Sequence, residues 1–169
     1  IPPLSCRSAL DEARAWRHRY PDVFIETCPQ YLTHTMDADL PESVGKANPP
    51  LRTQDDIDAL WEGLADGTID VIASDHVPRK KATKMTNIWK SSQGFPGTAT
   101  ILPVLLSEGY HKRGLPLTRI AELCGSGPAD IFEISARKGR LVVGADADIT
   151  IVDLDLEREV RHEDLESYS

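Results

Sequence analysis

The tripeptide Ser74-Asp75-His76 places two side chains that bind and release protons next to each other. It directly follows a short run whose apolar members are Ile69, Val71, Ile72 and Ala73. These residues are largely β-branched and lack polar alternation, and they therefore predict a strand buried on both faces of a parallel sheet. A carboxylate and an imidazole at a strand end are costly to desolvate unless other groups pair with them. Because α/β folds assemble their active sites at strand C-terminal ends, the tripeptide is a candidate site. The alternative is a solvated Asp–His turn.

The composition limits the classes of partner. With 169 residues, 40% hydrophobic and 27% charged, the chain is typical of one soluble globular domain or of a piece of a larger one. Its net charge of −8 argues against nucleic acid or an anionic membrane surface as the main partner, and no apolar run approaches the ~18 residues of a membrane span. Three widely spaced cysteines, Cys6, Cys28 and Cys124, fit neither a disulfide framework nor a Cys-x-x-Cys metal site, which favours a cytoplasmic location.

Two helix-to-strand units lead up to the candidate site. The first is a helix over residues 8–20 followed by a short strand over residues 23–25. The second is a helix that Thr53 caps through Asp56, followed by the strand 68–74. This repetition indicates an α/β fold with a parallel sheet. The buried stripe of the second helix is predicted to consist of Ile57, Leu60, Trp61 and Leu64.

Loops and further helices surround these units. Residues 33–52 are rich in breakers and predict a long loop, and the basic stretch 79–90 predicts a solvated lid or loop because it lacks clustered aromatics. Helices are predicted over residues 98–109 and 116–123, and a third, short helix begins at Pro128.

Near the C-terminal end the sequence pattern changes from helical to strand-like. Residues 139–144 and 147–153 are two runs of strand length, separated by Gly and Asp residues that favour turns. They predict the start of a separate, small β unit. We therefore divide the chain into residues 1–138 and residues 139–169.

Five motifs in the chain resemble those of the cyclic amidohydrolases, the family that includes hydantoinases, dihydropyrimidinases, allantoinases and bacterial-type dihydroorotases. Their order and spacing match across nearly the whole chain, so the combined signal is much more specific than any one motif. The motifs are Glu26-Thr27-Cys28-Pro29-Gln30-Tyr31-Leu32, Asn48-Pro49-Pro50-Leu51-Arg52, Ser74-Asp75-His76-Val77-Pro78, Gly94-Phe95-Pro96-Gly97, and the segment from Lys138-Gly139 to Gly144-Ala145-Asp146-Ala147-Asp148.

The resemblance implies that this chain is the C-terminal part of a metal-dependent (β/α)8 barrel, leading into a small β-sandwich. Residues 1–138 would supply the last strands and helices of the barrel, and residues 139–169 the start of the sandwich. The family builds a paired zinc centre, and the one ligand that can be placed here is Asp75, after the eighth strand. The sixth-strand histidine would fall at Pro3-Leu4-Ser5, which offers none. Because zinc takes about four ligands, we expect the chain alone to be inactive.

In the complete enzyme, the resemblance implies hydrolysis of a cyclic amide C–N bond, with Asp75 taking the proton of the attacking water and passing it to the leaving nitrogen. It places substrate contacts at Asn48, Gln93 and Gly94, although Asn48 could also be a simple turn former before Pro49. The expected partner is a small cyclic amide or imide, and the complete protein is expected to be a homo-oligomer.

The choice of substrate rests on conflicting signals. Gln30 favours hydantoinase-like members of the family, whereas Asn48 favours dihydroorotases and allantoinases. We predict ring opening of a hydantoin or a dihydropyrimidine. The alternatives are dihydroorotase or allantoinase activity, and a non-catalytic amidohydrolase-like scaffold.

Overall fold

Two short parallel strands form the centre of the fold. The computed structural model describes residues 3–38, 40, 43–84, 87–165 and 167. Strand β1 (Glu26–Thr27) pairs with β2 (Val71–Ile72), with Glu26 opposite Val71 and Thr27 opposite Ile72. The ladder is shorter than the predicted strand 68–74, and it lies after residues 23–25, where the first strand was predicted. The ladder does not extend back to Ile25, because the Ile25 N–H donates to the Asp70 carboxylate at 2.7 Å and not to a backbone carbonyl.

A third extended segment lies along the other edge of β1. The Leu4 N–H donates to the Glu26 carbonyl at 2.8 Å, and the Thr27 hydroxyl donates to the Leu4 carbonyl at 2.8 Å. Thr27 points its own carbonyl to the β2 side, where the Ala73 N–H donates to it at 2.9 Å. Pro3-Leu4-Ser5 thus occupies the place of a neighbouring strand, although no strand is assigned to it.

Helices α1 (Arg7–Arg19) and α3 (Gln54–Ala65) pack beside the strands, as predicted. Thr53 and Asp56 form the predicted capping box at the start of α3: the Thr53 hydroxyl accepts the Asp56 N–H, and the Asp56 carboxylate accepts the Thr53 N–H. A short helix that was not predicted, α2 (Pro29–Thr33), begins directly after β1. The core formed around α3 includes all four residues of its predicted stripe, Ile57, Leu60, Trp61 and Leu64.

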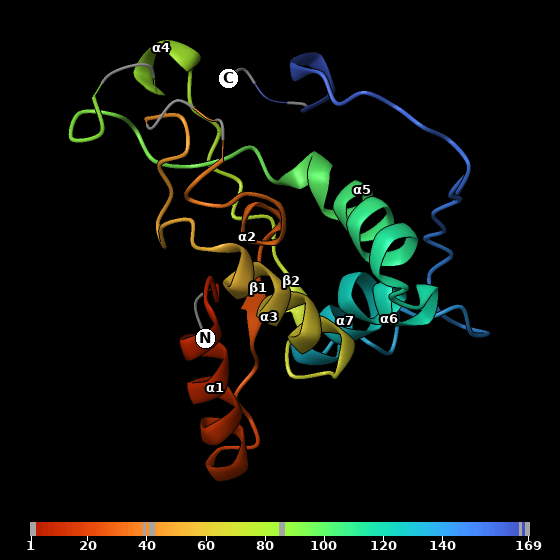
Figure 1. The fold of residues 1–169 in the computed structure, drawn as a ribbon. Coiled ribbons are helices and arrows are strands. Elements are labelled where there is room, and N and C mark those ends of the chain that lie inside the picture. Colours follow the sequence, from red (N-terminus) through yellow and green to blue (C-terminus); the bar gives the residue numbers. More distant parts are fainter. Residues whose placement is uncertain (1–2, 39, 41–42, 85–86, 166, 168–169) are drawn as a thin grey trace.

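The remaining helices follow β2 in the chain, and Figure 1 shows α5, α6 and α7 grouped on one side of the strand pair, with α4 apart from them. The helix predicted over residues 98–109 is present, and it runs further. The predicted helices at 116–123 and from Pro128 join into one, because a wide π-helical turn precedes Pro128, whose nitrogen has no hydrogen to donate. The elements are α4 (Lys81–Lys84), η1 (Thr98–Thr100), α5 (Ile101–Val104), the π-helix η2 (Leu105–His111), α6 (Leu117–Ala121), the π-helix η3 (Glu122–Ser126), α7 (Gly127–Ile131) and η4 (His162–Leu165). Within the described residues, no helix combines the length and apolarity of a bilayer span.

The C-terminal segment, residues 139–165, differs from the prediction. Neither residues 139–144 nor residues 147–153 form a strand, and Figure 1 shows the segment up to η4 as an irregular trace outside α5 and α6. Its backbone forms local turn bonds, such as that from Ala145 N–H to the Val142 carbonyl at 3.1 Å. A strand requires a neighbouring strand for its backbone groups, and in the described part of the chain these runs have none.

Candidate functional site

The parallel strand pair brings Gln30 and Asp75 together. Parallel strands place their C-terminal ends at the same edge of a sheet. Thr27 and Ile72 are opposite each other, and Gln30 and Asp75 each follow three residues later. At this edge the Gln30 side-chain N–H donates to Asp75 Oδ2 at 2.7 Å. The strand register therefore determines the position of the carboxylate predicted to carry the chemistry.

Asp75 lies in an unusual local environment. Its φ of +43° is in the left-handed region, which aspartate enters more readily than most residues do. Burial raises the pKa of the Asp75 carboxyl above its usual value, and the hydrogen bond from Gln30 opposes the shift. Among the described residues, Gln30 Oε1 is a buried acceptor without a hydrogen-bond partner. The strand end therefore holds a proton acceptor and an unused buried oxygen.

Cys28 and Tyr31 surround this carboxylate as neutral groups. Burial, and secondarily the charge of Asp75, raises the pKa of the Cys28 thiol and the pKa of the Tyr31 phenol. Cys28 is therefore a thiol at neutral pH, not a nucleophilic or metal-binding thiolate. The Tyr31 hydroxyl donates to the Pro49 carbonyl at 2.9 Å, which fixes the residue that follows Asn48.

The predicted substrate contacts lie on two loops joined to this edge. The Gly94 N–H donates to the Lys46 carbonyl at 3.1 Å, and the Val77 N–H donates to the Phe95 carbonyl at 2.9 Å. Asn48 and Gln93 are exposed. The structure thus brings together the segments that carry Asp75, Asn48, Gln93 and Gly94. In the part of the chain that it describes, the hydrogen-bond partner of Asp75 is Gln30.

Two glycines allow this close approach. A Cβ on Gly97 would lie 1.8 Å from the Ser74 carbonyl oxygen, and a Cβ on Gly94, whose φ is +125°, would lie 2.5 Å from the Val77 carbonyl oxygen. Any larger residue at either position would displace the backbone beside Asp75. The Gly-Phe-Pro-Gly motif is therefore a packing requirement of the strand end.

The histidines close to the site have structural contacts. His76 Nδ1 accepts the Thr98 N–H at 3.2 Å. The His34 ring stacks on Phe95 with 5.8 Å between centroids, and burial lowers the pKa of His34. The described residues contain no group of three or more His, Cys, Asp or Glu side chains that could hold a metal ion. Asp75 could serve as a single metal ligand, but the described residues do not provide a set.

Sequence reasoning missed two residues at this edge. From the sequence, Gln30 is only a marker of substrate preference, because its contact with Asp75 depends on the strand register, which no sequence signal reveals. Lys84 was included in the solvated basic stretch, but it is buried. No local signal distinguishes it from the exposed lysines around it.

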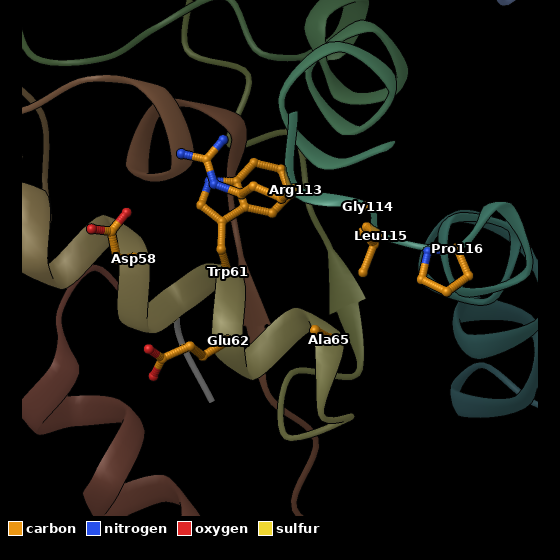
Figure 2. A pocket seen from close by; sticks show the side chains of 8 residues that line it. All are labelled: Asp58, Trp61, Glu62, Ala65, Arg113, Gly114, Leu115 and Pro116. Carbon is orange, nitrogen blue, oxygen red and sulfur yellow. The ribbon is translucent and has the colours of Figure 1, made fainter. Parts of the chain in front are cut away.

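A cavity of about 350 Å³ lies elsewhere, between α3 and the turn that follows η2. Figure 2 shows Arg113 against Trp61, whose ring centroid is 4.9 Å from the guanidinium carbon. None of the predicted site residues lines this cavity. Its lining residues are Asp58, Trp61, Glu62, Ala65, Arg113, Gly114, Leu115 and Pro116.

Comparisons with known proteins extend over most of the chain. Residues 18–167 match the family described as "Amidohydrolase family". A dihydroorotase from Halobacterium salinarum is 42% identical over 144 residues, which are 84% of this chain and 33% of the relative. An allantoinase from Rubrobacter xylanophilus is 40% identical over 153 residues, covering 89% of this chain and 34% of the relative.

The solved structures agree with the sequence comparisons. The structure of the L-hydantoinase (dihydropyrimidinase) from Arthrobacter aurescens matches 94% of this chain with a TM-score of 0.86 and 35% identity. The match covers 36% of that chain. The chain thus spans about a third of the length of these relatives.

Proposed function

Because the chain belongs to the amidohydrolase family, we propose that it supplies the C-terminal third of a metal-dependent enzyme that opens a cyclic amide ring. The observation that supports this most strongly is Asp75, held by Gln30 at the strand end where the Asn48 and Gly94 loops meet. Residues 1–138 would be the last part of the barrel. Residues 139–169 would be the start of the sandwich, whose partner strands would come from outside the described chain.

In this proposal Asp75 moves a proton between water and the leaving nitrogen. The carboxylate takes a proton as water adds to the amide carbonyl carbon, and it gives that proton to the ring nitrogen as the C–N bond breaks. A pKa raised by burial favours the first step, because it makes Asp75 a stronger base than an exposed aspartate. The Gln30 hydrogen bond occupies Oδ2 and leaves Oδ1 for the reaction.

The family's zinc centre would require ligands beyond this chain. Asp75 offers one carboxylate, whereas zinc takes about four ligands. No other described residue joins it in a metal-binding group. The proposal therefore requires a further stretch of polypeptide that carries the remaining ligands.

For the substrate we propose a hydantoin or a dihydropyrimidine. Gln30 and the structural likeness to the L-hydantoinase (dihydropyrimidinase) support this choice. The second candidate is dihydroorotate or allantoin, which the identities of 42% and 40% and the presence of Asn48 favour. The Asn48 amide offers one acceptor and a donor group, which suit the C=O and N–H of an imide-like ring edge in either case.

The test uses the complete polypeptide that carries this chain, loaded with zinc and offered hydantoin, dihydrouracil, dihydroorotate and allantoin. We expect turnover of at least one ring. Asp75→Asn should lower kcat by about 10²–10⁴-fold with a smaller loss of bound metal. His76→Asn is the adjacent control and should lower kcat less, because His76 contacts the Thr98 backbone.

Three outcomes would contradict parts of the proposal. Unchanged kcat in Asp75→Asn would remove this residue from the mechanism. If the zinc-loaded wild-type protein turned over none of the four rings, the non-catalytic scaffold would be the better description. Turnover by residues 1–169 alone, abolished by a chelator and restored by zinc, would show that the chain needs no outside ligands.

A further inference from the structure

Lys84, the last residue of α4, is a buried lysine among exposed basic residues. Its exposed fraction is 8%, whereas Arg79, Lys80, Lys81 and Lys90 are exposed. A buried ammonium loses hydration, so its protons require acceptors nearby. Burial, and secondarily the charge of Arg79, lowers the pKa of Lys84. Among the described residues, Lys84 takes part in no salt bridge with a carboxylate.

The acceptors are two backbone carbonyls from different loops. Lys84 Nζ donates to the Gly94 carbonyl at 2.5 Å and to the Lys46 carbonyl at 3.3 Å. It also lies 4.7 Å from the centroid of the Phe95 ring. The Lys46 carbonyl accepts the Gly94 N–H as well, at 3.1 Å. Lys84, Lys46 and Gly94 therefore form one closed set of hydrogen bonds.

Both loops carry residues for which we propose substrate contacts. Lys46 precedes Asn48 by two residues, and Gly94 is itself a proposed contact and follows Gln93 directly. Asp75, in contrast, is held by Gln30 and the strand register. The lysine thus acts on the loops and not on the carboxylate.

The two loops have further connections near this point. The Ser91 hydroxyl donates to the Ser43 carbonyl at 2.9 Å, and Lys46 Nζ donates to the Ile88 and Ser91 carbonyls at 2.8 and 2.9 Å. These bonds would keep the loops close without Lys84. What the Lys84 ammonium adds is a fixed spacing between the Lys46 and Gly94 carbonyls.

We propose that Lys84 is a positioning residue that sets the spacing between the Asn48 loop and the Gln93–Gly94 loop, and thereby the affinity for the cyclic amide. This inference rests on the proposed function for its substrate contacts. Without the ammonium, the two carbonyls lose a shared donor, and the loops relax relative to each other. The proton transfer at Asp75 continues, so the loss falls on substrate binding.

The experiment compares Lys84→Met, Lys84→Arg and the control Lys81→Met, an exposed lysine of the same helix α4. In the complete zinc-loaded protein, Lys84→Met should raise KM by about 10-fold and change kcat by less than about 3-fold. Lys84→Arg keeps the charge and the donors and should restore part of the affinity. Lys81→Met should match the wild type.

A second readout does not depend on turnover. In the complete protein, Lys84→Met should speed hydrogen exchange of the Gly94 amide by about 10-fold and leave exchange in α3 unchanged, whether or not the protein turns over a substrate. If Lys84→Met does not fold, Lys84→Gln, which keeps a neutral donor, takes its place with the same expected direction.

The outcomes separate this inference from the proposed function. An active wild type whose Lys84→Met variant keeps its KM would overturn the positioning role and leave the hydrolase proposal standing. An equal fall of kcat in Lys84→Met and Lys84→Arg would also overturn it. An inactive wild type would refute the hydrolase proposal. In that case, faster Gly94 exchange supports the role of Lys84 in joining the loops, and unchanged exchange refutes it.

Discussion

Helix α3 and the C-terminal segment, residues 139–165, both contain many apolar residues, but only α3 buries them. Leu60 and Leu64 of α3 have no exposed surface, whereas Val143 and Ile151 are almost fully exposed. The difference lies in the backbone. A helix satisfies its own N–H and C=O groups and needs only one packed face, whereas a strand-length run needs a neighbouring strand. Apolar content therefore predicts burial only where the partner of the backbone is also present.

The largest effect that tests this contrast is expected in the core of α3. Leu64→Ala removes a fully buried side chain and should lower the free energy of unfolding by about 2–5 kcal/mol. Val143→Ala is the matched change in the C-terminal segment and should stay within about 0.5 kcal/mol. Urea unfolding of both variants measures the difference. Equal losses would show that the C-terminal segment is packed in solution.

A smaller effect is expected at the start of α3. Thr53→Ala removes the hydroxyl that accepts the Asp56 N–H and should cost about 1 kcal/mol. Thr150→Ala, at an exposed position of the C-terminal segment, serves as the control and should change little. Thermal unfolding followed by circular dichroism detects a lower Tm for Thr53→Ala. If the two variants lost the same amount, the capping box would not be a stabilising feature.

A pH-dependent effect is expected at Glu108 in η2. Burial alone would raise the pKa of this carboxyl, but hydrogen bonds from Lys112 and Arg113 outweigh burial and lower it. The stability from these contacts is present above the usual glutamate pKa and is lost as the pH falls through the lower folded value. Glu108→Gln should therefore cost less than about 1 kcal/mol at pH 7. Below both pKa values the two proteins should unfold alike, and a difference that persisted there would assign the loss to packing.

Lysine substitutions in the C-terminal segment are expected to have the smallest effect on stability. Their effect on association is expected to be larger. The double variant Val143→Lys, Ile151→Lys should leave the free energy of unfolding within about 0.5 kcal/mol, because both side chains are exposed. Exposed apolar runs without partner strands promote association, so we expect the 169-residue chain to aggregate and the double variant to aggregate less. Light scattering at matched concentration compares them. A wild-type chain that stays monodisperse at the same concentration would contradict this expectation.

The sequence predicted the elements whose signals are local. The helix over residues 8–20 appears as Arg7–Arg19, and Thr53 caps α3 through Asp56 as expected. The strand predictions were wrong where a strand needs a partner strand: residues 139–144 and 147–153 form no strand in the described chain. The sequence alone could not show the helical joining of residues 117–131.

The candidate site was only partly predictable for the same reason. Asp75 stood out because an ionisable residue follows an apolar run. The Gln30 contact depends on strand register, and the burial of Lys84 depends on carbonyls that are 38 and 10 residues away in the chain. Such contacts arise from tertiary structure, and no local pattern of residue types predicts them.

Two backbone contacts affect how the sequence of this protein can vary. They are the hydrogen bond from the Val77 N–H to the Phe95 carbonyl and the isolated β-bridge between His76 and Phe95. They join the two ends of the intervening segment beside the strand end, so its closure does not depend on its length. Doubling the length of a flexible loop costs only about 0.6 kcal/mol of closure entropy. Insertions and deletions that leave Lys84, Ser91 and Gly94 in their contacts can therefore accumulate at little thermodynamic cost. Natural variation of this kind can reshape what the loop recognises while Asp75 keeps its place.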